Sequence, residues 1–221
     1  MENFKVKVLK GKNLLGWRLK IVDSDNVQIT VGRFENWEKI IEQKKEWILH
    51  QLTKMPVKKS LLSQKVINFL GEEYSLNISL GKSDSLIFFD EQKEVHVRVK
   101  TVTDNYIKKM IDKKIRTKAL KIIRDKTKEL AKKFDITIGD IKIKNQKTRF
   151  GSCAGNGNLN FNWQIILFPV DKFEHVILHE LTHILEHNHS HRFWGKLQEM
   201  DNNCYQNNQW LKTSALKYFI I

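Results

Sequence analysis

The stretch HELTHILEHNHSHRFW, residues 179–194, decides how this sequence is interpreted, because it holds five of the chain's eight histidines. His179 and His183 are four residues apart, and Glu180 directly follows the first of them. In an α-helix, residues four apart lie about 40° apart around the axis and about 6 Å along it, so both imidazoles can reach one ion. This is the HExxH pattern, in which two histidines bind zinc and the glutamate is the general base for an attacking water.

The residues before this stretch predict that it begins inside a helix. Asp171 and Glu174 follow Pro169 with the spacing of a capping box, which satisfies free N–H groups at a helix start. We expect the helix to run from about Lys172 to His187, with Asn188 ending it in a left-handed conformation. The apolar positions that would form its buried stripe are Phe173, Ile177, Leu181, Ile184 and Leu185.

A third metal ligand has to come from beyond this helix. An ion held between the two motif histidines would lie about 9 Å along the axis from the α-carbons of His175 and His187, too far for an imidazole bond of about 2 Å. His189 and His191 are both within reach once the chain turns back, and Glu199 is a third possibility. Periodicity alone does not choose among these three.

A strand is expected shortly before the helix, after three closely spaced glycines at 151, 155 and 157. Residues 158–163 alternate strictly, with asparagine on one face and a large apolar residue on the other. Such a strand can lie at a sheet edge and pair with an extended peptide, or it can simply present its polar face to solvent. Its apolar positions are Leu159, Phe161 and Trp163, and its polar positions are Asn158, Asn160 and Asn162.

Four segments in this order resemble the YgjP-like metallopeptidase family, relatives of the SprT-type zinc proteases. They are TRFGSC (148–153), NLNFNW (158–163), HVILHELTH (175–183) and NHSHRFW (188–194). The resemblance is specific over residues 147–194 and extends more loosely to most of the chain.

The resemblance implies that zinc is held by His179, His183 and His189, with Glu180 catalytic. One departure is Phe150, where the family usually has tryptophan, which bears on packing rather than on metal binding. His191 occupies a variable position of the family pattern.

The activity implied is that of a zinc metalloendopeptidase acting on proteins or peptides through a zinc-bound water activated by Glu180. The strand at 158–163 is the expected place for the substrate backbone. Phe193 and Trp194 are expected to anchor the turn that carries His189. The sequence does not assign the group that stabilises the oxyanion, for which the candidates are Tyr205, Arg149, His191 and Arg192.

The rest of the chain predicts an N-terminal region rich in strands. Alternating runs on both sides of the turn residues DSDN (23–26) predict a hairpin, and those at 66–81 and 85–100 predict further strands. Between them a helix capped by Asn36 should run to about Lys54, ended by Pro56. The side chains expected on its inner face are Trp37, Ile40, Ile41, Trp47 and Ile48.

Residues 104–134 carry apolar side chains at near-helical spacing, which predicts one long amphipathic helix or two shorter ones. These side chains are Ile107, Met110, Ile111, Ile115, Leu120, Ile123, Leu130 and Phe134. The fold expected is α+β, as one continuous YgjP-like domain. Its N-terminal part, residues 1–135, holds the β-rich region and the basic helix. A zincin-like catalytic part, residues 136–221, packs the HExxH helix on a small sheet.

The net charge of +14 raises the question of anionic partners. Residues 100–133 contain 13 Lys and Arg against four Asp and Glu, a net +9. Charge runs of this kind are usually a solvated helix face, and base-stacking aromatic residues are missing from the densest part. The related SprT and WLM groups include enzymes that digest proteins crosslinked to DNA. The alternative function is therefore a DNA-associated protease, or a basic nucleic-acid-binding module with a zinc site.

The composition also bears on where the protein acts. No run of about 18 apolar residues is present that could cross a bilayer, so no membrane partner is expected. Cys153 and Cys204 are too few and too far apart in sequence for a disulfide framework. Both observations favour the cytoplasm.

Overall fold

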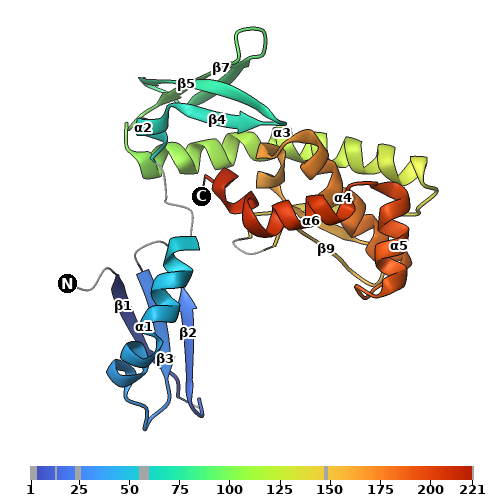
Figure 1. The fold of residues 1–221 in the computed structure, drawn as a ribbon. Coiled ribbons are helices and arrows are strands. Elements are labelled where there is room, and N and C mark those ends of the chain that lie inside the picture. Colours follow the sequence, from blue (N-terminus) through green and yellow to red (C-terminus); the bar gives the residue numbers. More distant parts are fainter. Residues whose placement is uncertain (1–3, 13, 23–25, 55–59, 147–148, 221) are drawn as a thin grey trace. The chain divides into compact units, whose positions relative to one another are not determined.

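The computed structural model describes residues 4–12, 14–22, 26–54, 60–146 and 149–220, shown in Figure 1. The chain is a mixed α+β protein that divides into two compact units, residues 1–58 and 59–221. The boundary predicted after residue 135 lies inside the second unit and stays a prediction. In the described residues, no helix is long and apolar enough to cross a membrane, and both cysteines are free thiols.

The first unit is a three-stranded sheet with one helix. Its strands β1 (Lys5–Lys10), β2 (Trp17–Ile21) and β3 (Asn26–Val31) have the order β1-β3-β2. The predicted hairpin is confirmed, because β2 pairs with β3 antiparallel, whereas β1 pairs with β3 parallel. Residues 23–25 of the predicted turn lie outside the described residues.

The helix of this unit, α1 (Trp37–Lys54), begins as predicted. The backbone N–H of Lys39 donates to the Asn36 side chain over 2.9 Å, which caps the helix start. Ile40, Ile41 and Ile48 are buried on the inner face as predicted, and Leu52 joins them. Trp47 is 48% exposed and does not belong to that face. Pro56 lies outside the described residues.

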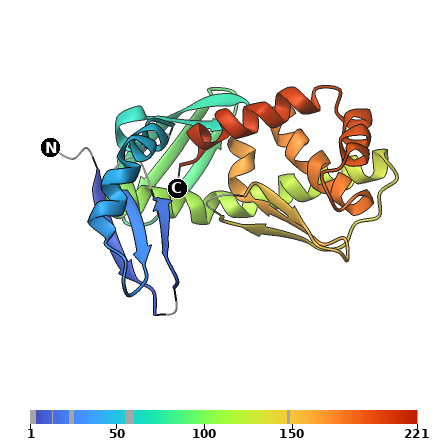
Figure 2. The same ribbon diagram turned by 60° about the horizontal axis from the view of Figure 1, so that its bottom comes forward.

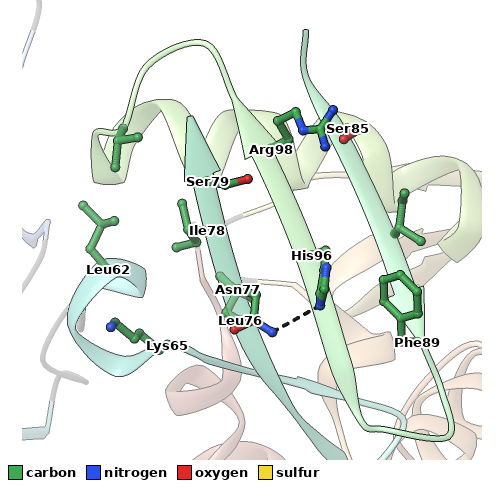
Figure 3. A pocket seen from close by; sticks show the side chains of 12 residues that line it. Leu62, Lys65, Leu76, Asn77, Ile78, Ser79, Ser85, Phe89, His96 and Arg98 are labelled. Carbon is green, nitrogen blue, oxygen red and sulfur yellow. Dashed lines mark hydrogen bonds between the residues drawn. The ribbon is translucent and has the colours of Figure 1, made fainter. Parts of the chain in front are cut away.

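The second unit contains a four-stranded sheet in the order β4-β5-β7-β6. Its strands are β4 (Val66–Phe69), β5 (Glu72–Leu80), β6 (Ser85–Phe89) and β7 (Glu94–Val99), preceded by the short helix α2 (Leu61–Gln64). One face packs against the long helix that follows. On the other face, Figure 3 shows the side chains of His96 and Arg98 in a hollow of about 560 Å³. Asn77 and His96 form a hydrogen bond there between neighbouring strands (3.2 Å).

The basic segment forms one 30-residue helix, α3 (Asp104–Lys133), capped by Thr103, whose side chain accepts a bond from the Tyr106 N–H. Four residues of an α-helix span 400°, so a row of every fourth residue advances about 40° around the axis at each step. The two ends of α3 therefore bury different faces, one against the four-stranded sheet and the other against the C-terminal part (Figure 1, Figure 2). The buried row is Ile107, Ile111, Ile115, Ala119, Ile123, Thr127 and Ala131.

A three-stranded sheet, in the order β8-β10-β9, follows α3. Its strands are β8 (Ile141–Lys144), β9 (Gly151–Cys153) and β10 (Leu159–Asn162). Of the two alternatives for the 158–163 strand, the edge position is wrong, because β10 pairs with β9 on one side and with β8 on the other. The two edge strands of this sheet are β8 and β9, and β9 is the one that contains Gly151.

The alternation of β10 is confirmed on its apolar face, where Leu159 and Phe161 are fully buried. On the polar face Asn162 is also buried, contrary to expectation. Its side chain accepts the Gln164 N–H (3.1 Å) and donates to the carbonyl of Arg149 (3.2 Å). Asn162 thereby ends the strand and caps the 3-10 helix η1 (Trp163–Leu167), which contains the buried Trp163.

The C-terminal part consists of helices α4 (Val170–Leu185), α5 (His191–Met200) and α6 (Cys204–Thr213) and the 3-10 helix η2 (Ala215–Tyr218). The predicted capping box at the start of α4 is wrong. Pro169 is the N-cap, and the two carboxylates form ion pairs instead, Asp171 with Lys172 (2.6 Å) and Glu174 with Lys126 (3.1 Å).

The end of α4 also differs from the expectation. The helix ends at Leu185, two residues earlier than predicted, and Glu186 is already extended with φ of −140°. Asn188 does not adopt a left-handed conformation. Beyond Glu186 the chain bends at residues 187, 188 and 190, and the Ser190 N–H donates to the Asn188 carbonyl (2.7 Å), so this segment turns back and brings His189 toward the helix.

Candidate metal centre

Three imidazoles converge at the end of α4. His179 and His183 come from successive turns of the helix, and His189 comes from the segment that connects α4 to α5. One ring nitrogen from each lies within 4.8 Å of the others, and the Nε2 atoms of His179 and His189 are 3.0 Å apart. Two nitrogens bound tetrahedrally at 2.0–2.1 Å from one ion are about 3.4 Å apart, so this donor set fits a zinc-sized ion.

The position of His189 depends on the first turn of α5. The Ser190 side chain accepts the Phe193 N–H (3.4 Å), which starts this helix immediately after His189. The fully buried Phe193 ring has its centroid 4.6–5.0 Å from each of the three imidazole rings. Phe193 therefore packs against all three histidine rings and helps to hold them in place.

Trp194, the second expected anchor, lies farther from the histidine rings than Phe193 does. Its ring centroid lies 6.1 Å from that of His189, and it stacks on Tyr205 of α6 at 5.4 Å. Both aromatic residues contact the core cluster of the second unit. The turn between α4 and α5 is thus anchored by apolar packing, as the sequence predicted.

His179 and His183 favour the neutral form, which can donate a lone pair to a metal. Burial, together with the smaller effect of the neighbouring histidines, lowers the pKa of His179 to about 3. Burial also lowers the pKa of His183, whose Nδ1–H donates to the Glu186 carbonyl (3.2 Å) and so fixes the ring. An outer hydrogen bond of this kind orients a ligating histidine.

The other groups proposed as a third ligand lie elsewhere. His191 and Glu199 are exposed on α5 and do not belong to the cluster. His187 is exposed as well. His175 is fully buried, and its Nδ1 lies 2.6 Å from a carboxylate oxygen of Asp201. Of the histidines the sequence offered, only His189 joins the motif pair.

Glu180 belongs to α4, and its side chain faces β9. The residue is only 6% exposed. A Cβ added at Gly151 would lie 2.6 Å from its Oε1 atom, so only glycine permits this approach of strand and carboxylate. Burial raises the pKa of Glu180 to about 8. A carboxyl group tuned to this range can take up and release a proton near neutral pH.

Sequence reasoning missed the polar network that fixes the start of α4 to the turn between α5 and α6. Asp201 accepts from the Asn207 side chain (2.9 Å) as well as facing His175, and Lys172 donates to Asn207 (2.6 Å). The Nε2 atom of His175 has no partner among the described residues. The recurrence of histidine every four residues pointed to His175, but no sequence signal pointed to Asp201 or Asn207.

A pocket of about 240 Å³ opens beside Glu180, between β9 and α6. Of the residues considered for oxyanion stabilisation, Arg149 lines this pocket. Tyr205 is 54% exposed and stacked on Trp194, and His191 and Arg192 are exposed.

A family model for the YgjP-like metallopeptidase domain matches residues 16–214. The chain belongs to this family, whose class is that of the metallopeptidases. No curated protein matches the chain.

Two solved structures show partial similarity. One is the metallopeptidase zymogen jannalysin of Methanocaldococcus jannaschii, with 26% identity over 41% of this chain and 93% of that chain and a TM-score of 0.37. The other is the zymogen abylysin of Pyrococcus abyssi, with 12% identity over 42% and 94% of the two chains and a TM-score of 0.37.

Proposed function

We propose that this protein is a zinc-dependent endopeptidase of the HExxH type with a zincin-like catalytic region. The observation that carries the proposal is the convergence of His179, His183 and His189 beside the buried Glu180. Three nitrogen donors with an adjacent carboxylate are typical of catalytic zinc sites, which keep a fourth position open. When bound, the ion would supply a Lewis acid that polarises the scissile carbonyl and lowers the pKa of water.

Glu180 is the general base in this proposal. Its carboxylate would accept a proton from the attacking water and donate it to the leaving amine. The close approach of Gly151 keeps the side chain beside the histidine cluster, and burial keeps its pKa near that of a group that exchanges protons at neutral pH.

The substrate backbone is proposed to pair with β9 rather than with β10. The Asn162 N–H donates to the Phe150 carbonyl (2.7 Å), and the Ala154 N–H donates to the Asn158 carbonyl (2.9 Å). In an antiparallel ladder, alternate residues point their N–H and C=O groups away from the partner. Gly151 and Cys153 therefore direct their backbone groups toward the open edge of the sheet, where an extended peptide can add as a strand.

The test compares wild-type protein with Glu180→Gln at equal zinc content, measured by elemental analysis. We expect the variant to retain about one zinc per chain and to lose about 10²–10⁴-fold in the rate of cleavage of a denatured protein. Equal rates for the two proteins would remove Glu180 from the mechanism. Absence of zinc from both would remove the metal site.

A second candidate function, contact with nucleic acid, rests on the basic face of α3. Lys113, Lys114 and Lys121 are exposed there. Lys118 is not part of this surface, because its Nζ atom lies over the Phe88 ring at 3.9 Å. DNA binding at about 50 mM salt that disappears when the three exposed lysines are changed to glutamine would support this role, and no binding by wild type would end it.

Location in the cytoplasm, inferred from composition, stays a prediction.

A further inference from the structure

The pocket beside Glu180 has a composition that the hydrolytic mechanism does not explain. Its polar lining consists of His179 and Glu180 of α4, Asn208 and Lys212 of α6, and Arg149, which precedes β9. Arg149 and Lys212 bring two positive charges to the pocket, and among the described residues that line it, Glu180 alone carries a carboxyl group. The pocket therefore carries excess positive charge.

Neither cation is used by the protein itself. In the part of the chain that the structure describes, the side chains of Arg149 and Lys212 form no ion pair or hydrogen bond. Both charges are thus available to an incoming group.

The remaining walls define the shape of that group. Phe150, Val176 and Leu211 form the apolar part of the pocket lining. A volume of about 240 Å³ is below the 300–1,000 Å³ that is usual for complete small-molecule sites, and it suits a single side chain. An aliphatic stem that ends in a carboxylate matches both the apolar wall and the cations.

The pocket also lies where a peptide on β9 would present a side chain. Gly151 belongs both to the pocket wall and to the edge strand. Side chains of a peptide paired to that edge would alternate between the two faces of the sheet, and one face is toward α4 and Glu180. A residue next to the scissile bond would then place its side chain in the pocket.

We propose that this pocket is a specificity site that selects an acidic residue, glutamate or aspartate, next to the cleaved bond. The proposal rests on the proposed peptidase function and names the substrate class of that site. Arg149 and Lys212 would bind the carboxylate, Asn208 would donate a hydrogen bond from its amide, and the apolar wall would contact the stem.

The experiment uses the full-length zinc-loaded protein and maps cleavage sites in a denatured protein by mass spectrometry. Peptides that carry Glu, Gln or Lys next to the cleaved bond, and are otherwise identical, are then compared by kcat/KM. We expect glutamate to be preferred over glutamine by roughly tenfold or more. Lys212→Glu and Arg149→Glu should each remove this preference, and the double variant should favour lysine.

Lys128→Glu on α3 is the matched control, since it makes the same charge change at an exposed position away from the pocket. It should leave the preference unchanged, which separates a local site from general attraction between a +14 chain and acidic peptides. Lys212→Met keeps the stem without the charge and should also lose the preference.

The outcomes distinguish the two proposals. If wild-type protein cleaves peptides but shows no acidic preference, or if the double variant keeps the wild-type preference, the specificity site is overturned while the peptidase function stands. If wild-type protein cleaves nothing with zinc bound, the proposed function itself fails.

Discussion

Gly151 of the small sheet lies so close to Glu180 of the helix that carries the motif that a Cβ on Gly151 would be 2.6 Å from both Cγ and Oε1 of the glutamate. The strand and the carboxylate are therefore positioned by each other. A methyl group at position 151 must displace either β9 or the side chain of Glu180, and both belong to the proposed catalytic arrangement.

We predict that Gly151→Ala lowers kcat by at least tenfold while the metal content stays at the wild-type value, since the proposed ligands come from α4 and the turn after it. Activity and elemental analysis on the same preparation measure both quantities. Gly155→Ala is the control, because nothing lies within 4 Å of a Cβ at that position. Full activity of the Gly151 variant would show that the approach has no catalytic role.

The three converging histidines predict a single divalent site that stabilises the fold. Replacing any of His179, His183 or His189 by alanine should lower zinc from about one per chain to near zero. Adding a chelator should lower the melting temperature of wild type, because a ligand that binds only the folded state stabilises it. His191→Ala, at an exposed position outside the cluster, should retain wild-type zinc. Loss of zinc in that variant would contradict the ligand set.

The buried contact between His175 and Asp201 predicts a purely structural phenotype. Asp201→Ala removes the partner of a fully buried imidazole and of the Asn207 amide, which should lower the free energy of unfolding by about 2–4 kcal/mol. Denaturant unfolding measures this change, and zinc content should be unaffected in the folded protein. Glu199→Ala, at an exposed position, should change stability by less than about 0.5 kcal/mol.

The raised pKa of Glu180 predicts how the stability of the metal-free protein depends on pH. Folding favours the protonated carboxyl, so its stabilising effect is complete below the ordinary pKa of 4.5 and is lost as the pH rises toward about 8. The metal-free Glu180→Gln variant has no carboxyl group at this position, so it does not lose stability in this way as the pH rises. Its stability relative to wild type should rise between pH 5 and pH 8 by an amount on the order of 3 kcal/mol.

The comparison isolates one group, because the histidines titrate in both proteins. Unfolding curves in urea at five or six pH values measure it. A difference that stays constant across this range would mean that the carboxyl group titrates normally in the folded protein.

The spacing of residues within one helix or strand could be interpreted directly from the sequence. Helices and strands have fixed periods, so His179 and His183 had to share a face of α4, and Leu159 and Phe161 had to share a face of β10. The cap at Asn36 and the hairpin of β2 and β3 are likewise local and were correctly expected. The positive charge of α3 could also be predicted from the sequence. The division of its buried row between the four-stranded sheet and the C-terminal part could not.

Misassigned local features depended on partners distant in sequence. Asp171 and Glu174 have capping-box spacing, but Glu174 pairs with Lys126 of α3. Residue Asn162 looked solvent-facing, but it is buried where β10 meets η1. The strand containing it looked like an edge, but β8 pairs with its second side. Local propensity is weak compared with the burial and pairing that tertiary contacts impose.

By itself, the sequence determined that two histidines and a glutamate share one helix, since helical geometry needs only the spacing of those residues. The choice of His189 over His191 and Glu199, the contact between Gly151 and Glu180, and the open edge of β9 were decided by the tertiary structure. Each of these depends on how separate segments pack around Phe193 and the small sheet, and a distance between segments is set by packing in three dimensions rather than by any period along the chain.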